Sequence, residues 1–285
     1  MKIHLAEHYG LCFGVRDALA TAHAAAENGP VTVLGEIVHN PIARRKLESA
    51  GARDGRLERP GSASTRDVII TAHGASNGMR KAWQQAGHRL IDTTCPLVRK
   101  AHDSLAALVA AGFFPVVIGQ HDHVEVRGLI GDFPQALVIL DEAEISKIPE
   151  HPRIGVISQT TQPPDHVADL VQRIRLRFPR ATVRFVNTVC YPTRQRQEAL
   201  EALCRSCDHV VVVGGRSSNN TASLATKAER MGARAIHVET ADELEPDWFE
   251  HAENVGVTAG TSTLEETVQA VVERLKSFAI LEVAR

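Results

Sequence analysis

The chain has 285 residues, of which 44% are hydrophobic and 23% are charged, and its formal net charge is −2. This is the composition of a globular protein, and without a basic field the chain is not expected to bind nucleic acid. The N-terminal stretch MKIHLAEHYG is too polar for a signal peptide, and the most apolar run, residues 105–119, is too short to span a bilayer. We therefore expect a cytoplasmic protein without a membrane partner, whose cysteines stay reduced.

Three of the five cysteines introduce the same pattern along the chain. Each is followed four residues later by an arginine, and the arginine begins a stretch with helical periodicity. The three cysteines are Cys12, Cys95 and Cys190, and the predicted helical stretches are residues 16–28, 99–112 and 194–207.

The pattern continues beyond each predicted helix. A β-branched run ends at a glycine and a polar loop follows, and then a second predicted strand ends in another polar loop. Helices alternating with strands predict parallel sheets, and a repeat of about 85 to 95 residues predicts three α/β domains. We expect domain 1 at residues 13–94 with an N-terminal strand in residues 1–12, domain 2 at 95–189, domain 3 at 190–275, and a C-terminal tail at 276–285.

The polar loops are the expected ligand-binding elements. In open α/β sheets, ligands bind beyond the carboxyl ends of the strands, and every one of these loops follows a predicted strand. If the three domains surround a pseudo-threefold axis, their loops face one central cavity. The fold class is thus predicted to be α/β, a trefoil of three similar domains with parallel sheets.

The three repeated cysteines favour a metal centre. A helix start stabilises a thiolate, and three thiolates leave one tetrahedral position open, as zinc or an iron–sulfur cluster would use. Dedicated zinc sites draw closely spaced ligand pairs, so the wide spacing here favours a [4Fe–4S] cluster with one open iron. Cys204 and Cys207 form a C-x-x-C pair, but it has no counterpart in the other repeats and is expected to be structural.

The loop residues suit a compact anion such as a diphosphate. Histidine, serine and asparagine beside glycines offer hydrogen-bond donors, and no Walker-type motif is present. The carboxylate in this set, in a closed cavity, could deliver protons. The set is His39, His73, His123, Glu125, Gln159, Thr160, Thr161, Ser217, Ser218, Asn219, Asn220 and Ser262.

Together these stretches resemble the 4-hydroxy-3-methylbut-2-enyl diphosphate reductase family, over nearly the whole chain. The motifs that carry the resemblance are LCFGVRDA, GEIVHNP, TAHGAS, DTTCPLV, HVEVRG, SQTT, NTVCYPTRQRQEA, GGRSSNNT and GVTAGTST.

The resemblance implies a [4Fe–4S] cluster held by Cys12, Cys95 and Cys190 at the centre of the trefoil. It implies reductive removal of the hydroxyl of an allylic diphosphate substrate, giving isopentenyl and dimethylallyl diphosphates, with electrons from an external ferredoxin or flavodoxin. Glu125 would lead the proton relay, with Thr160 near the substrate hydroxyl. The diphosphate would be held by His39, His73, His123, Ser217, Ser218, Asn219 and Ser262, with Asn220 adjoining.

Two positions depart from the family pattern, and two other functions compete. Val124 and Leu264 stand where the family usually has proline, so the loop of Glu125 loses some rigidity and one helix loses a favoured first residue. A quinolinate-synthase-like lyase would need more arginines in the cavity loops than Arg127 and Arg216. A non-catalytic iron–sulfur redox protein would not need the histidine, serine and asparagine set.

Overall fold

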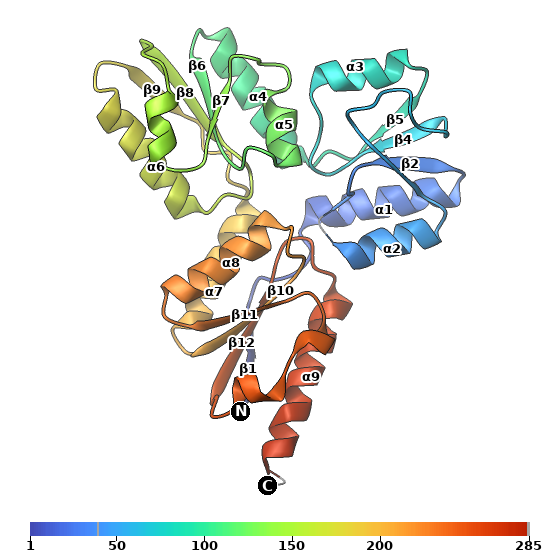
Figure 1. Ribbon diagram of the computed structural model, residues 1–285, viewed down its shortest axis with the longest axis vertical. Coiled ribbons are helices and arrows are strands. Elements are labelled where there is room, and N and C mark those ends of the chain that lie inside the picture. The colour runs from blue at the N-terminus through green and yellow to red at the C-terminus, as the bar shows by residue number, and fades with distance from the viewer. Residues whose placement is uncertain (39, 284–285) are drawn as a thin grey trace. The chain divides into compact units, whose positions relative to one another are not determined.

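The computed structural model describes residues 1–38 and 40–283, and the chain divides into two units (Figure 1). The first unit comprises Met1–Phe13, His39–Pro41 and Tyr191–Arg285, and it contains one parallel sheet. The second unit comprises Gly14–Val38 and Ile42–Cys190, and it contains two. Each unit is described by itself.

Both sheets of the second unit are parallel and have four strands each. In the first, the spatial order is β3-β2-β4-β5, with β2 (Val31–Leu34), β3 (Arg53–Gly55), β4 (Asp67–Ile70) and β5 (Arg89–Asp92). In the second, the order is β7-β6-β8-β9, with β6 (Phe114–Ile118), β7 (Leu137–Ile139), β8 (Arg153–Ser158) and β9 (Thr182–Phe185). The helical segments are α1 (Phe13–Glu27), α2 (Pro41–Ser49), α3 (Asn77–Gln85), α4 (Pro96–Ala110), α5 (Val124–Ile130), η1 (Ala143–Lys147) and α6 (Pro164–Arg177).

The sheet of the first unit repeats this arrangement with the start of the chain as its fourth strand. Its order is β1-β12-β10-β11, and β1 takes the edge place that β5 and β9 take in the other sheets. Its strands are β1 (Lys2–Leu5), β10 (His209–Val213), β11 (Arg234–Val238) and β12 (Asn254–Ala259). Its helical segments are α7 (Tyr191–Cys204), α8 (Asn219–Arg230), η2 (Ala241–Glu243), η3 (Pro246–Phe249) and α9 (Glu265–Val283).

Three similar parallel α/β sheets confirm the predicted fold class, but two details of the predicted domains are wrong. The N-terminal strand does not add to domain 1, because Lys2 to Leu5 pair with Asn254 to Val257 of β12. The edge place beside β12 in this sheet is therefore taken by β1. The expected tail at 276–285 is also wrong for the most part, since α9 runs to Val283 and Phe278 is buried in the core.

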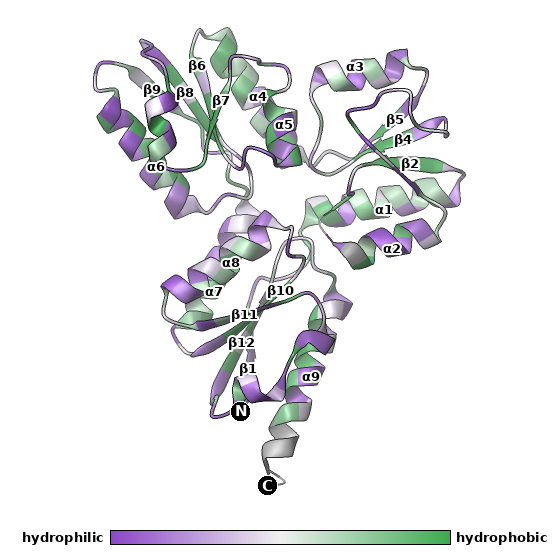
Figure 2. Cartoon of the chain, in the orientation of Figure 1, coloured by the Kyte–Doolittle hydropathy of each residue, from purple (hydrophilic) through white to green (hydrophobic). Residues whose placement is uncertain are grey.

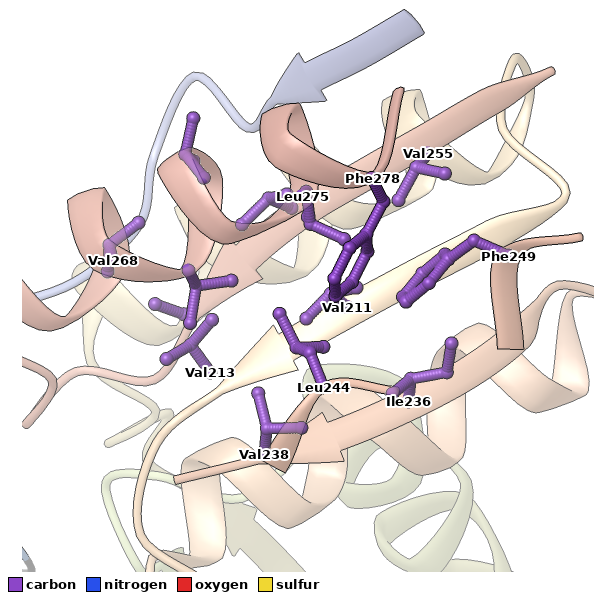
Figure 3. Packing of buried hydrophobic residues seen from close by; sticks show 14 of the residues in the cluster. Val211, Val213, Ile236, Val238, Leu244, Phe249, Val255, Val268, Leu275 and Phe278 are labelled. Atoms are coloured by element: carbon purple, nitrogen blue, oxygen red, sulfur yellow. The ribbon is translucent and has the colours of Figure 1, made fainter. Parts of the chain in front are cut away.

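Helices cover both faces of the sheets, as an all-parallel sheet requires. Along β6, the residues alternate between two cores: Val116 and Ile118 pack with α6, whereas Val117 packs with α4 and α5. The hydropathy colours follow this pattern, with apolar strands between helices that are polar on the outside (Figure 2). In the first unit, Phe249 and Phe278 close the core between β10, β12 and α9 (Figure 3).

Within residues 1–38 and 40–283, none of the helices has both the length and the apolar character needed to cross a membrane.

Glycines at two strand ends let α8 approach the sheet of the first unit. Gly214 follows β10 with φ +146°, and Gly260 follows β12. A β-carbon on Gly260 would lie 2.0 Å from Thr221 Oγ1, and one on Gly214 would lie 2.7 Å from the same atom. Thr221 is fully buried in the first turn of α8. The start of α8 therefore fits against the sheet only because both positions lack a side chain.

Gly260→Ala is expected to lower the free energy of unfolding by about 1–3 kcal/mol, because its methyl group would push Thr221 and the first turn of α8 outward. Urea unfolding followed by circular dichroism measures the change. The double variant Gly260→Ala with Thr221→Ala removes the clashing hydroxyl and should recover part of the loss. A single variant as stable as the wild type would contradict this account of the packing.

Val124, one of the departures from the family pattern, is the first residue of α5. The N–H at this position has no partner within the helix, and the preceding His123 is extended, with φ −69° and ψ 136°, as a residue before proline should be. Proline therefore fits here without losing a hydrogen bond. The other departure, Leu264, directly precedes α9, and its carbonyl accepts from Thr267 and Val268.

Val124→Pro is expected to raise the free energy of unfolding by about 0.4–1 kcal/mol, because proline restricts the unfolded chain more than the folded one. Thermal unfolding measures the change. Arg127→Pro, three residues further into the same helix, serves as the control and should destabilise strongly, because the Arg127 N–H donates to the His123 carbonyl at 3.0 Å. A lower melting temperature for Val124→Pro would show that the first turn of α5 does not tolerate proline.

Candidate active site

The three repeated cysteines make the same backbone contact. One edge strand of each sheet, β1, β5 or β9, leads to one of these cysteines. The cysteine N–H donates to the backbone carbonyl of the second residue after the neighbouring strand, which is β12, β4 or β8. Cys12 thus bonds to Thr261 after β12 at 3.0 Å, Cys95 to Ala72 after β4 at 3.0 Å, and Cys190 to Thr160 after β8 at 2.9 Å.

These bonds join each cysteine to a loop that carries a predicted ligand or catalytic residue. Ser262 follows Thr261, His73 follows Ala72, and Thr160 is itself a predicted site residue. A hydrogen bond fixes the two backbones at about 3 Å from one another, so each thiol-bearing residue keeps a set relation to its polar loop. The sequence repeat therefore corresponds to a repeated local structure.

Cys95 lies in close contact with the first turn of α1. A β-carbon on Gly14 would be 2.5 Å from Cys95 Sγ, so the glycine leaves the space that the sulfur occupies. Next to this cysteine, Asp92 accepts from Thr94 and pairs with Arg80 at 3.1 Å and with Arg99 at 3.0 Å. Burial of Asp92 opposes ionisation, but the bonds from Thr94 and the charge of Arg80 lower its pKa below the ordinary value.

The cysteines have no disulfides among the described residues, and they fall into two groups. Cys12, Cys95 and Cys190 make the repeated backbone bond described above and are partly exposed, as is Cys204. Burial raises the pKa of both Cys204 and Cys207, which keeps these two as neutral thiols, and Cys207 belongs to a hydrophobic core. The C-x-x-C pair thus has the surroundings of structural cysteines.

Glu125 is 1% exposed and is held by one residue of a neighbouring loop. One of its carboxylate oxygens accepts from the Thr160 N–H at 2.6 Å, and the other accepts from Thr160 Oγ1 at 2.9 Å. Because the Thr160 carbonyl accepts from Cys190, the carboxylate, the hydroxyl and this cysteine belong to one hydrogen-bonded chain. Gly119, at the end of β6, leaves room for this arrangement, since a β-carbon there would be 2.8 Å from Val126.

His123 and His73 meet at the junction of the two sheets of the second unit. Their rings lie 5.6 Å apart, edge to face. His123 also begins α5: its Nδ1 accepts from the Glu125 N–H at 3.1 Å, so the neutral ring carries its proton on Nε2. His121, in the same loop, instead pairs with Glu144 at 2.9 Å, and bonds from Lys147 and His121 lower the pKa of Glu144 to about 2.

Asp132 connects the segments that follow these two histidines through hydrogen bonds. Its carboxylate accepts from the N–H groups of Asn77 at 2.6 Å and Gly78 at 2.8 Å, at the start of α3. An acidic side chain is favoured there because the helix start carries partial positive charge. This contact joins the segment after α5 to the segment after His73.

The remaining predicted residues lie in the first unit, around the start of α8. Ser218 is the N-cap and accepts from the Thr221 N–H at 3.4 Å, and Ser217 is exposed. Asn219 and Asn220 are the first two residues of the helix, whose partial positive charge at this end favours an anion. Asn220 is 1% exposed, and both polar atoms of its side chain lack a hydrogen-bond partner within the described part of the chain.

Ser262 lies in the loop after β12 and is 5% exposed. Its carbonyl accepts from Asn40 Nδ2 at 2.7 Å, which links Asn40 to this loop. His39 itself lies outside the described residues.

Sequence reasoning missed three residues that hold these loops in place: Asn40, Asp132 and Arg196. Asn40 and Arg196 stand inside the motifs GEIVHNP and NTVCYPTRQRQEA, and both are buried polar residues. Asp132 stands in no such motif, and nothing in its neighbourhood marked it.

Cys12 belongs to the first unit, whereas Cys95 and Cys190 belong to the second. In the part of the chain that the structure describes, no three His, Cys, Asp or Glu side chains form a ready metal-binding group.

Comparison with known proteins gives one family. The family model described as LytB protein matches residues 3–276. The chain is 33% identical over 284 residues to the 4-hydroxy-3-methylbut-2-enyl diphosphate reductase of Aquifex aeolicus, covering 98% of this chain and 97% of that protein. It is 38% identical over 280 residues to the protein of the same name from Pelobacter propionicus, covering 96% and 98%.

Solved structures agree with this result. The E-1-hydroxy-2-methyl-but-2-enyl-4-diphosphate reductase of Plasmodium falciparum matches with a TM-score of 0.89 and 28% identity, over 96% of this chain and 87% of that one. A structure of (E)-4-hydroxy-3-methyl-but-2-enyl diphosphate reductase matches with a TM-score of 0.70 and 31% identity, over 97% and 100%. The chain therefore belongs to the LytB family, that of the 4-hydroxy-3-methylbut-2-enyl diphosphate reductases, and is an enzyme of the oxidoreductase class.

Proposed function

We propose that the protein reduces (E)-4-hydroxy-3-methylbut-2-enyl diphosphate to isopentenyl and dimethylallyl diphosphates. The substrate C–O bond breaks and a C–H bond forms, with two electrons and two protons taken up and one water released. The relatives named above support this substrate. The observation that carries the proposal is the repeated backbone bond from Cys12, Cys95 and Cys190 to loops that bear polar site residues.

Members of the LytB family use an iron–sulfur cluster, and the residues of this chain fit one. We assign Cys12, Cys95 and Cys190 as the ligands of a [4Fe–4S] cluster with one open iron, at the centre of a three-domain trefoil. The repeated backbone bond of these cysteines and the lack of a side chain at Gly14 beside Cys95 support the assignment. When bound, the cluster supplies single electrons and a Lewis acid for the substrate hydroxyl.

The diphosphate is held by two groups of donors. His123, with its proton on Nε2, and the neighbouring His73 form one group. Ser217, Ser218, Asn219 and Asn220 at the start of α8, together with Ser262 and His39, form the other. The buried and unpartnered amide of Asn220 supports a ligand there, because an unsatisfied buried polar group costs about 1–3 kcal/mol. Anchoring the diphosphate places the far end of the substrate for reaction.

Glu125 and Thr160 carry the proton chemistry. The Thr160 hydroxyl lies 2.9 Å from a carboxyl oxygen of Glu125. When Glu125 is protonated, this hydroxyl turns to accept the carboxyl proton and passes its own proton to the substrate oxygen. The burial of Glu125 keeps bulk water away from the departing hydroxyl. A soluble one-electron donor of the ferredoxin or flavodoxin type delivers the electrons, and the reaction takes place in the cytoplasm, where thiols stay reduced.

Anaerobic assay with the hydroxy-methylbutenyl diphosphate and reduced methyl viologen tests the proposal. Cys12→Ser should lose cluster iron and activity together, because serine does not replace a thiolate ligand. Cys204→Ser, at a cysteine that the proposal leaves out, is the matched control and should keep both. Full iron and sulfide content in purified Cys12→Ser would rule out cluster ligation by this residue.

Glu125→Gln should keep the cluster and lose turnover by roughly 10²- to 10⁴-fold, the usual contribution of a general acid. The amide oxygen of glutamine still accepts from Thr160, so the loop should stay in place. Iron content, the visible spectrum and kcat are measured on the same preparation, with Glu144→Gln as the control. Normal turnover by Glu125→Gln would remove Glu125 from the proton route.

A further inference from the structure

Arg196 is a buried arginine that holds backbone far away in the sequence. It lies on α7, is 5% exposed, and donates to three carbonyl groups. Its Nη1 bonds to Pro192 in the first turn of α7 at 2.9 Å. Its Nη2 bonds to Gly10 at 2.5 Å and to Tyr9 at 3.3 Å, and its Nε bonds to Gly10 at 3.2 Å. Tyr9 and Gly10 lead directly into Cys12, so one guanidinium joins the Cys12 loop to the start of α7.

A second contact links the same two segments. The rings of Phe13 and Tyr191 stack with centroids 5.6 Å apart and an angle of 6° between their planes. Phe13 directly follows Cys12, and Tyr191 directly follows Cys190. Each ring-bearing residue thus has its Cα about 3.8 Å from that of a cysteine, which is the span of one peptide unit. Arg196 thus contacts the residues before Cys12, and Tyr191 contacts the residue after it.

The position of Arg196 is special to the third repeat. It is the sixth residue after Cys190, and the sixth residues after Cys12 and Cys95 are Ala18 and Ala101. All three side chains are buried, at 5%, 2% and 0% exposure. The matched site in the other helices therefore holds a methyl group, and only the third helix places a large charged donor there.

Chain connectivity gives the physical reason for this difference. β5 and β9 follow their own sheets along the chain, and they lead directly to Cys95 and Cys190. β1 precedes both other sheets along the chain, and Tyr9 and Gly10 are 187 and 186 residues away from Arg196. No short chain connection joins the Cys12 loop to the other strands of its sheet, so noncovalent contacts must hold it there. Removing a guanidinium from water costs free energy, and the bonds to three carbonyl groups offset this cost. The burial of Arg196 therefore favours the one position of the Cys12 loop in which these bonds form.

We propose that Arg196 is the positioning residue for Cys12: it takes the place of a short chain connection and fixes the Cys12 thiol for cluster binding. The inference rests on the proposed function for its cluster, but its local consequence is independent of activity. Loss of the guanidinium should loosen the Cys12 loop and leave Cys95 and Cys190 unchanged.

Arg196→Met removes the donors at similar volume, and Arg194→Met, at an exposed arginine of the same helix turn, is the matched control. In the chelator-stripped full chain, iodoacetamide should alkylate Cys12 of Arg196→Met about tenfold faster than in the wild type, the factor expected for losing a hydrogen bond to a charged group. Mass spectrometry follows all three cysteines, and Cys95 and Cys190 should react at their wild-type rates. In the reconstituted protein, a ferrous chelator should also remove iron faster from this variant.

Equal acceleration at all three cysteines would indicate general loosening and overturn the positioning role, as would an unchanged rate at Cys12. Arg196→Lys provides a second test if the methionine variant does not fold. Lysine carries one ammonium group and does not span three carbonyls, so Cys12 alkylation should be intermediate, and a wild-type rate would overturn the inference. A wild-type protein that takes up no iron would contradict the proposed function instead. The alkylation rates of the iron-free chain would still report how firmly Arg196 holds the Cys12 loop.

Discussion

The arrangement depends on one repeated hydrogen bond, from the N–H of each repeated cysteine to a carbonyl just beyond a strand of the same sheet. The bond matters because the strand ends carry the polar loops, whereas the cysteines begin helices that belong to the next repeat along the chain. Without it, thiol and loop would be separate surface features. With it, each repeat presents a cysteine and a polar residue as one rigid unit.

The same bond also links the two halves of the proposed chemistry. Thr160 accepts from Cys190 through its carbonyl and donates to Glu125 through its N–H and its hydroxyl. One residue therefore serves both the proposed metal ligand and the proposed acid. The buried carboxylate keeps its two acceptor bonds, which offsets part of the cost of removing it from water. A buried site of this kind is stable only when its polar groups are partnered, and Thr160 provides that for Glu125.

At the start of α8 in the first unit, by contrast, buried polar groups lack hydrogen-bond partners among the described residues. Asn220 and Thr221 are buried at the start of α8, and the side-chain polar atoms of Asn220 and the hydroxyl of Thr221 have no partner in the described part of the chain. Glycines at positions 214 and 260 bring this helix start close to the sheet. A buried polar group without a hydrogen-bond partner raises the free energy of the folded state, so such groups mark positions at which a ligand or a water molecule supplies the partner. The diphosphate proposed above has the oxygen acceptors that such donors need.

The three-part α/β fold, the repeated cysteines and the polar loops could be predicted from the sequence, because helix and strand periods and turn residues are local properties of the chain. It did not determine which sheet the first strand joins, since Lys2–Leu5 has a pattern that suits any sheet edge. It also left Asp132, Asn40 and Arg196 unrecognised. Their partners lie 54 or 55, 222, and up to 187 residues away, and helical periodicity gave no reason to prefer Arg196 over its exposed neighbour Arg194. These contacts could be found only in the folded chain, because they depend on which backbone carbonyls and N–H groups folding leaves without a partner.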